Sequence, residues 1–201
     1  MTGLSGEKAL VLGAGHPSGR AIAIALAEAG ADVCVASLTA SRAEEFAVNS
    51  AANEIWALQR KGKALVVNAS DPAQVSKAIA DALDEMGGLT IVIIHADGIR
   101  YVEQVAGAVV SRLSGADNGC VVIVPSGVLP ADVADELIGG TGILQLAESL
   151  ASRSQRVRVI AVVDQPVQGG TPGPGPTIAS LVVHAVTPGS AVETGTVRYP
   201  A

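Results

Sequence analysis

The stretch VLGAGHPSGRAIAIALAEAGADVCVAS, residues 11–37, decides the expected fold. It begins with an apolar run, turns through Gly13, Gly15 and Gly19, and continues into apolar residues at helical spacing over 18–29. A second apolar run, rich in valine, follows directly. A buried strand, a glycine turn, a helix and another buried strand form a βαβ unit, in which the two strands run parallel.

The same alternation continues along the chain. We expect strands at 9–14, 31–37, 64–69, 90–96, 120–126, 157–163 and 195–200. Apolar residues at helical spacing predict helices at 18–29, 41–61, 72–86, about 100–113, about 131–153 and 176–186. This order predicts an α/β, Rossmann-like, doubly wound sheet of seven mainly parallel strands with helices on both faces. The length of 201 residues suits one domain spanning 1–201, in which QGGTPGPGPT (168–177) forms a loop.

Composition excludes several classes of function. The net charge of -6 and only four lysines leave no basic surface for nucleic acid or for an anionic membrane. No apolar run is long enough to span a bilayer, and the first residues do not resemble a leader, so we expect a soluble, cytoplasmic protein. Cys34 and Cys120 lie inside apolar runs, which indicates buried, reduced thiols. No cysteine and histidine spacing fits a metal site.

The glycine turn has the position of a phosphate-binding loop, because the helix after it points its amide groups at the turn. Gly13, Gly15 and Gly19 are the candidate cofactor-binding residues. Here the chain resembles the short-chain dehydrogenase/reductase family, whose turn reads Thr-Gly-x-x-x-Gly-x-Gly. The resemblance continues through VVNASDPAQV (66–75), LTIVIIHADG (89–98), LAESLA (146–151) and SAVETGTVRYP (190–200).

The cofactor site departs from the family pattern. Leu12 replaces the threonine of the turn, and Pro17 replaces the middle glycine, which removes one backbone N–H. Ser37 stands where an acidic residue would bind the ribose, whereas Asn68 keeps a side chain that can hydrogen-bond the adenine. Asp97 places a carboxylate near the expected nicotinamide ribose. We expect that this chain binds no cofactor and keeps the turn for its fold, with NAD(P) as the dinucleotide under the alternative in which the turn still binds.

The family's catalysis, as the resemblance implies, depends on a Tyr-x-x-x-Lys pair, in which the lysine lowers the pKa of the tyrosine. That pair is absent, since no lysine follows Lys77. Counting back from LAESLA, the tyrosine position falls on Glu136 and the lysine position on Gly140, while Ser126 matches the family serine. The family's substrate lid is also missing, because only residues 164–175 separate the sixth strand from the last helix. We therefore expect no catalytic residue.

The three histidines and the oligomer-forming helices complete the expectations. His95 and His184 are expected in the core or at its boundary, and His16 in an exposed loop. The helices near 100–113 and 131–153, the second with several small residues, correspond to those that assemble family oligomers. The sequence thus predicts a non-catalytic pseudo-subunit that pairs with an active short-chain dehydrogenase paralogue in a hetero-oligomer such as a hydroxyacyl-CoA dehydrogenase complex.

Two alternatives remain open. One is an NAD(P)-dependent oxidoreductase with an atypical set such as Ser126 with Glu136 or Asp97. The other is a homo-oligomeric module that binds a nucleotide without chemistry.

Overall fold

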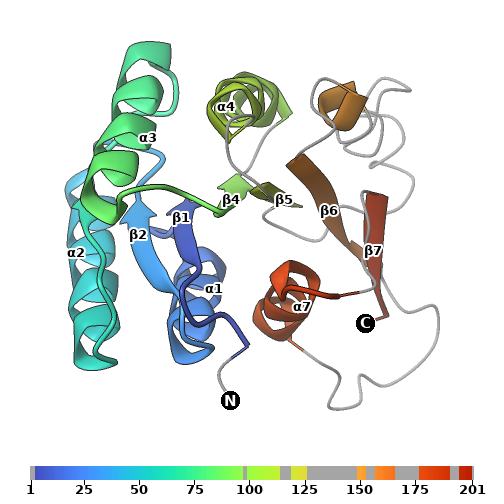
Figure 1. The fold of residues 1–201 in the computed structure, drawn as a ribbon. Coiled ribbons are helices and arrows are strands. Elements are labelled where there is room, and N and C mark those ends of the chain that lie inside the picture. The colour runs from blue at the N-terminus through green and yellow to red at the C-terminus, as the bar shows by residue number, and fades with distance from the viewer. Residues whose placement is uncertain are drawn as a thin grey trace.

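The computed structural model describes residues 3–96, 99–113, 119–125, 149–152, 157–165, 177–190 and 195–200. These residues form one sheet with helices on both faces (Figure 1). The strands are β1 (Lys8–Leu12), β2 (Asp32–Ala36), β3 (Ala64–Leu65), β4 (Ile91–Ala96), β5 (Gly119–Pro125), β6 (Val157–Gln165) and β7 (Gly195–Pro200). The labelled helices are α1 (Pro17–Glu28), α2 (Arg42–Ala57), α3 (Pro72–Met86), α4 (Ile99–Leu113) and α7 (Ile178–Val186).

The sheet has the order β3-β2-β1-β4-β5-β6-β7. Every pair of neighbouring strands is parallel, so the predicted doubly wound α/β fold with seven strands is confirmed. The chain builds outward from β1 to β3 and then crosses back to place β4 on the other side of β1. In sheets of this kind ligands bind at such a reversal, beyond the carboxyl ends of the strands.

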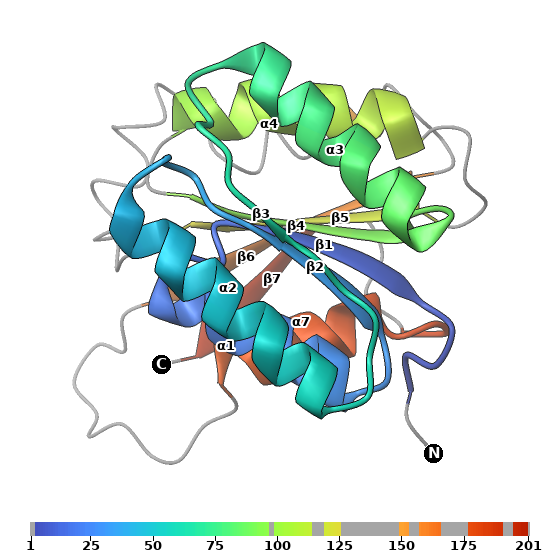
Figure 2. The same cartoon turned by 90° about the vertical axis from the view of Figure 1, so that its left-hand side faces the viewer.

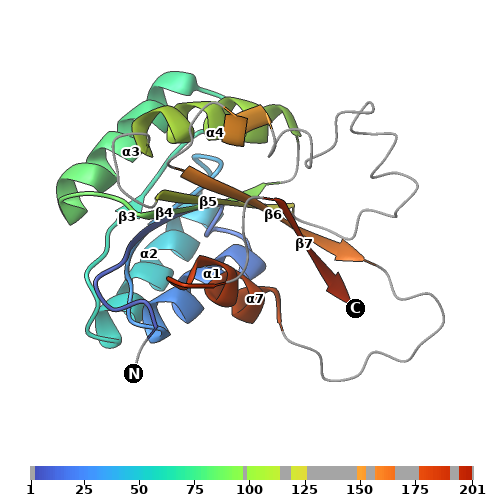
Figure 3. The same cartoon turned by 45° about the vertical axis from the view of Figure 1, so that its right-hand side comes forward.

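The two faces of the sheet carry separate cores (Figure 2). Leu10 and Leu12 of β1 point to the layer that holds α3 and α4. Ala9 and Val11, which alternate with them, point to the layer of α1, α2 and α7. Figure 3 shows β6 and β7 side by side, with α7 on the face of the sheet that also carries α1 and α2. Strands buried on both faces must be apolar at nearly every position, which explains the continuous valine and isoleucine runs.

Most predicted helices agree with the structure to within a few residues. Pro72 begins α3, and the Asp71 carboxylate accepts a hydrogen bond from the Ala73 N–H at 2.9 Å. The expected helix 41–61 is too long, because α2 ends at Ala57. Gln59, just beyond that end, has a φ of 60°, a left-handed conformation that a continuing helix does not allow.

The expected strand 64–69 is also too long. Only Ala64 and Leu65 pair with β2. Beyond them the Ser37 hydroxyl accepts a hydrogen bond from the Val67 N–H at 2.8 Å and donates one to the Val67 carbonyl at 3.1 Å. A side chain thus replaces the backbone partner that would have extended the ladder.

Several predictions fall outside the described residues. Residues 126–148, with most of the expected helix 131–153, are among them, although 149–152 are helical. The loop 168–177 is outside too, except for Thr177, which caps α7. Within the described part of the chain, no helix has the length and apolar character needed to cross a bilayer.

Candidate functional site

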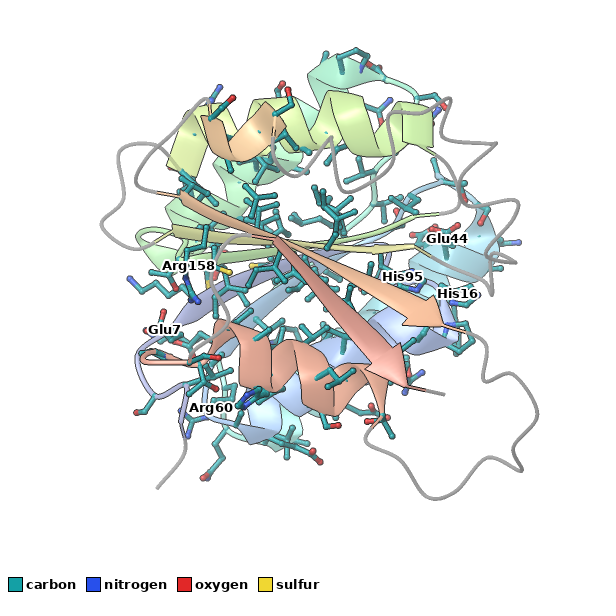
Figure 4. All side chains as sticks on the ribbon, turned by 90° about the vertical axis from the view of Figure 1, so that its right-hand side faces the viewer. Glu7, His16, Glu44, Arg60, His95 and Arg158 are labelled. Atoms are coloured by element: carbon teal, nitrogen blue, oxygen red, sulfur yellow. The ribbon has the colours of Figure 1, made fainter. Side chains whose placement is uncertain are left out.

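The candidate site lies at the reversal of strand order, where the turn after β1 meets the carboxyl end of β4. Figure 4 shows His16, Glu44 and His95 at the carboxyl ends of the strands, with Glu7 and Arg158 at the opposite, amino ends. The topology therefore brings the glycine turn beside residues about eighty positions further along the chain.

Two glycines of the turn are required by close packing. Gly13 has a φ of 90°, and a Cβ on it would lie 1.9 Å from the His95 carbonyl oxygen. A Cβ on Gly19 would lie 2.2 Å from the Gly13 carbonyl oxygen. Both distances are far below van der Waals contact. The turn therefore packs directly against β4, and the start of α1 packs directly against the turn. The fold alone thus accounts for Gly13 and Gly19.

The amino end of α1 is capped by this chain's own side chain. His16 is the N-cap residue, and its Nδ1 accepts a hydrogen bond from the Ser18 N–H at 3.4 Å. Pro17, the first helical residue, has no N–H to offer. A helix amino end attracts anions through its free N–H groups and its dipole. Here the proline removes one of those groups and the imidazole occupies another.

A hydrogen-bonded chain of three side chains crosses the site. The Ser18 Oγ lies 2.8 Å from Nδ1 of His16 and 2.7 Å from Nε2 of His95. The two imidazole rings are stacked, with centroids 5.1 Å apart and planes at 25°. His95 is 1% exposed, whereas His16 is exposed, as the sequence predicted for both. Ser18 was missed, because no local pattern in the sequence shows that the start of α1 lies next to the carboxyl end of β4.

A carboxylate lies at the other side of the turn. Glu44, in the first turn of α2, accepts hydrogen bonds from the Leu38 N–H at 2.7 Å and the Thr39 N–H at 3.1 Å. The Thr39 hydroxyl donates to the same carboxylate at 2.8 Å. A Cβ on Gly15 would lie 2.7 Å from Cγ of Glu44, so the glutamate lies directly against the turn.

Glu44 was also missed from the sequence. The available signal is the Ser-x-x-Glu pattern of Ser41 and Glu44, which predicts a glutamate folded back over a helix start. In dinucleotide-binding proteins an acidic residue after the second strand binds the ribose. Ser37 cannot do this, because it is fully buried and its hydroxyl bonds to Val67. Glu44 brings a carboxylate to that region from the following helix.

The remaining predicted residues lie apart from this cluster or outside the described residues. Asn68 follows β3, and its Oδ1 accepts a hydrogen bond from the Ser70 N–H at 3.0 Å, which forms the turn into α3. His184 was expected in the core or at its boundary, and this is wrong, because its side chain is exposed on α7. Asp97, Ser126, Glu136 and Gly140 lie outside the described residues.

A parallel sheet of this order with a glycine turn at its reversal is typical of Rossmann-type proteins, many of which bind dinucleotides. The family model described as short chain dehydrogenase matches residues 7–126. The chain therefore belongs to the short-chain dehydrogenase family. It is similar to a short-chain dehydrogenase/reductase of Armillaria gallica, with 38% identity over 91 residues. The match covers 45% of this chain but only 34% of that protein.

Solved structures confirm the same fold. A short chain dehydrogenase from Mycobacterium smegmatis superposes with a TM-score of 0.80 at 18% identity, covering 100% of this chain and 94% of that one. A short chain dehydrogenase from Burkholderia cenocepacia in complex with NADP superposes with a TM-score of 0.73 at 22% identity, covering 97% and 96%. At such identities the likeness establishes the architecture alone.

Proposed function

We propose that this chain is a cytoplasmic subunit of a short-chain dehydrogenase hetero-oligomer that takes no part in hydride transfer itself. It pairs with an active paralogue and completes the assembly, as in a hydroxyacyl-CoA dehydrogenase complex. The active paralogue supplies the dinucleotide site and the proton transfer.

One observation carries the proposal. The family's tyrosine and lysine belong to the segment between the fifth and sixth strands, and here residues 126–156 contain neither amino acid. Without them no phenol has its pKa lowered for proton transfer to or from an alcohol or carbonyl. The two strands that flank this segment, β5 and β6, are adjacent and parallel.

The arrangement of the side chains around the glycine turn supports the proposal that no dinucleotide binds there. His16 caps the helix end that would face the pyrophosphate, and Glu44 is hydrogen-bonded to its own loop. A ligand phosphate would have to displace the imidazole and lie near a carboxylate of the same charge. Both effects lower the affinity for a dinucleotide.

The proposed contact surface includes α4. Its Val105, Ala106, Val109 and Val110 are buried against the sheet, while Gly107 and Ala108 are only partly buried. Small residues that are only partly buried let a neighbouring helix approach closely, which suits a helix interface between subunits.

The experiment is native mass spectrometry of the protein purified from its own cells, read for subunit composition and bound nucleotide together. We expect a heteromer in which the number of bound dinucleotides equals the number of copies of the active paralogue. A homo-oligomer that carries one dinucleotide per copy would contradict the proposal.

Glu44 favours a second candidate, a homo-oligomeric NAD-binding module or an oxidoreductase with an atypical site. A carboxylate next to Gly15 suits a ribose hydroxyl and opposes a 2′-phosphate, so this candidate predicts binding of NADH over NADPH. Titration followed by NADH fluorescence tests it, with Glu44→Gln as the variant that should reduce the preference. Absence of NADH binding at millimolar concentration excludes it.

A further inference from the structure

Ser18 lies between two histidines in a way that dehydrogenase chemistry does not use. A hydroxyl has one proton to donate, so Ser18 donates to one imidazole and accepts from the other. The Ser18 N–H donates to Nδ1 of His16, so this nitrogen carries a lone pair. The hydroxyl proton is therefore directed at Nδ1 of His16, while the Nε2–H of His95 donates to the Ser18 oxygen.

We propose that Ser18 is a nucleophile that takes an acyl group from a small carboxylic ester, with His16 as its general base and His95 as a positioning residue. A serine becomes nucleophilic when a base lies within hydrogen-bond distance and is held in place. The 2.8 Å separation between Ser18 Oγ and Nδ1 of His16 meets the first condition. The stacking of His16 on the buried His95 ring meets the second.

The place of Ser18 in the fold suits this role. It is the second residue of α1, after a strand and a tight turn, which is also how the nucleophile of many hydrolases is presented at the edge of a sheet. Pro17 has no N–H and the Ser18 N–H bonds to Nδ1 of His16, so the helix dipole, which is positive at this end, is the main source of stabilisation. The negative charge that forms on the ester oxygen during attack is stabilised at such an end.

Access differs among the three side chains. Ser18 is half-buried, His16 is exposed and His95 is 1% exposed. A small ester can therefore reach Ser18 from solvent, and His16 can exchange its proton with water. His95 holds the serine oxygen from inside the protein.

The reaction balances with water as the only co-substrate. The Ser18 oxygen forms a bond to the acyl carbon, and its proton moves to Nδ1 of His16. The bond from the acyl carbon to the alcohol oxygen breaks, and His16 returns the proton to the departing alcohol. Water then attacks the acyl-serine with His16 again as base, which releases the carboxylic acid and restores the Ser18 hydroxyl.

The test is acylation of the purified full chain by p-nitrophenyl acetate and labelling by an alkyl fluorophosphonate, with peptide mass mapping. We expect one label per chain on Ser18 and at least a tenfold loss of nitrophenol release in Ser18→Ala. The matched control is Ser5→Ala, an exposed serine before β1 and so at the other end of that strand, which should keep the unmodified rate. Equal rates in Ser18→Ala and the unmodified chain would overturn the proposal.

A second pair of measurements tests the base. His16→Gly should lose labelling at Ser18, and added imidazole should restore part of it, because His16 is exposed and leaves space that solvent reaches. A fall in labelling that imidazole does not restore, in a variant with unchanged circular dichroism, would contradict the role of His16. These experiments read the chemistry of this chain alone, so their failure leaves the proposed subunit role intact.

Discussion

Gly13 shows how one residue connects the turn to the sheet. It needs both a positive φ and the absence of a Cβ, because the His95 carbonyl lies where that atom would be. Gly6 has almost the same φ, 88° against 90°, but nothing lies within 4 Å of its missing Cβ. The two glycines therefore separate the cost of conformation from the cost of a clash.

Gly6→Ala should lower the free energy of unfolding by about 1 to 2 kcal/mol, the cost of a left-handed non-glycine residue. Gly13→Ala should cost roughly 3 kcal/mol or more, because backbone atoms must move as well. Urea unfolding of both variants checks this difference. Equal losses would mean that the turn adapts freely.

The two thiols are the other residues with a defined chemical expectation. Cys34 and Cys120 are buried and form no disulfide, as predicted. Burial raises the pKa of each thiol to about 11 from an ordinary 9.0. The unfolded chain therefore loses these protons at a lower pH than the folded chain does.

This difference makes stability depend on pH. The contribution of the thiols is fully present below pH 9 and is lost as the pH rises toward 11, with about 2 kcal/mol expected for each thiol. Free energies of unfolding at pH 8 and pH 10.5 should therefore differ more in the natural chain than in Cys34→Ala/Cys120→Ala. A pH slope that is unchanged in the double variant would refute this assignment.

At the scale of elements, Glu44 in the first turn of α2 holds the loop after β2 in place through hydrogen bonds. Its carboxylate is the acceptor for two backbone N–H groups and one hydroxyl. Glu45, the next residue along the helix, is exposed and serves as a control of the same amino-acid type. The pair isolates the effect of the hydrogen bonds from that of charge and helix propensity.

Glu44→Ala should lower the free energy of unfolding by about 1 to 2 kcal/mol, because the N–H groups of Leu38 and Thr39 lose a charged acceptor. Glu45→Ala should change it by less than about 0.5 kcal/mol. Thermal and urea unfolding measure both. A loss in Glu45→Ala as large as in Glu44→Ala would show that the loop hydrogen bonds contribute nothing particular.

At the scale of the whole molecule, the two cores share one sheet. Leu10 is 0% exposed and faces the layer of α3 and α4, whereas Trp56, the only tryptophan, belongs to α2 on the other face. A change at Leu10 and the fluorescence of Trp56 therefore report on opposite layers. This arrangement tests whether the chain unfolds as one unit.

Leu10→Ala should destabilise the protein by about 2 to 5 kcal/mol. We expect it to shift the unfolding midpoints of Trp56 fluorescence and of far-ultraviolet circular dichroism equally, as in a two-state transition. A shift in circular dichroism with an unchanged Trp56 midpoint would mean that the layers unfold separately.

Most of the fold was predictable from local patterns. Strand and helix positions follow from the spacing of apolar residues, and helix starts follow from caps such as Asp71 before Pro72. The boundaries that were wrong depend on contacts the pattern does not contain. Gln59 turns the chain after α2, and the Ser37 hydroxyl ends the pairing of β3.

The sequence by itself determined the parallel α/β architecture, the glycine turn and the absence of tyrosine and lysine from 126–156, because these are matters of order and composition. Only the tertiary structure decided which side chains meet beside the glycine turn. Ser18 and His95 are 77 positions apart and meet because β4 returns to lie beside β1. Glu44 reaches Gly15 because α2 begins at the carboxyl end of the strands, where the glycine turn also lies. Side chains from separate elements become neighbours only when the sheet fixes the order of its strands, which no local pattern records.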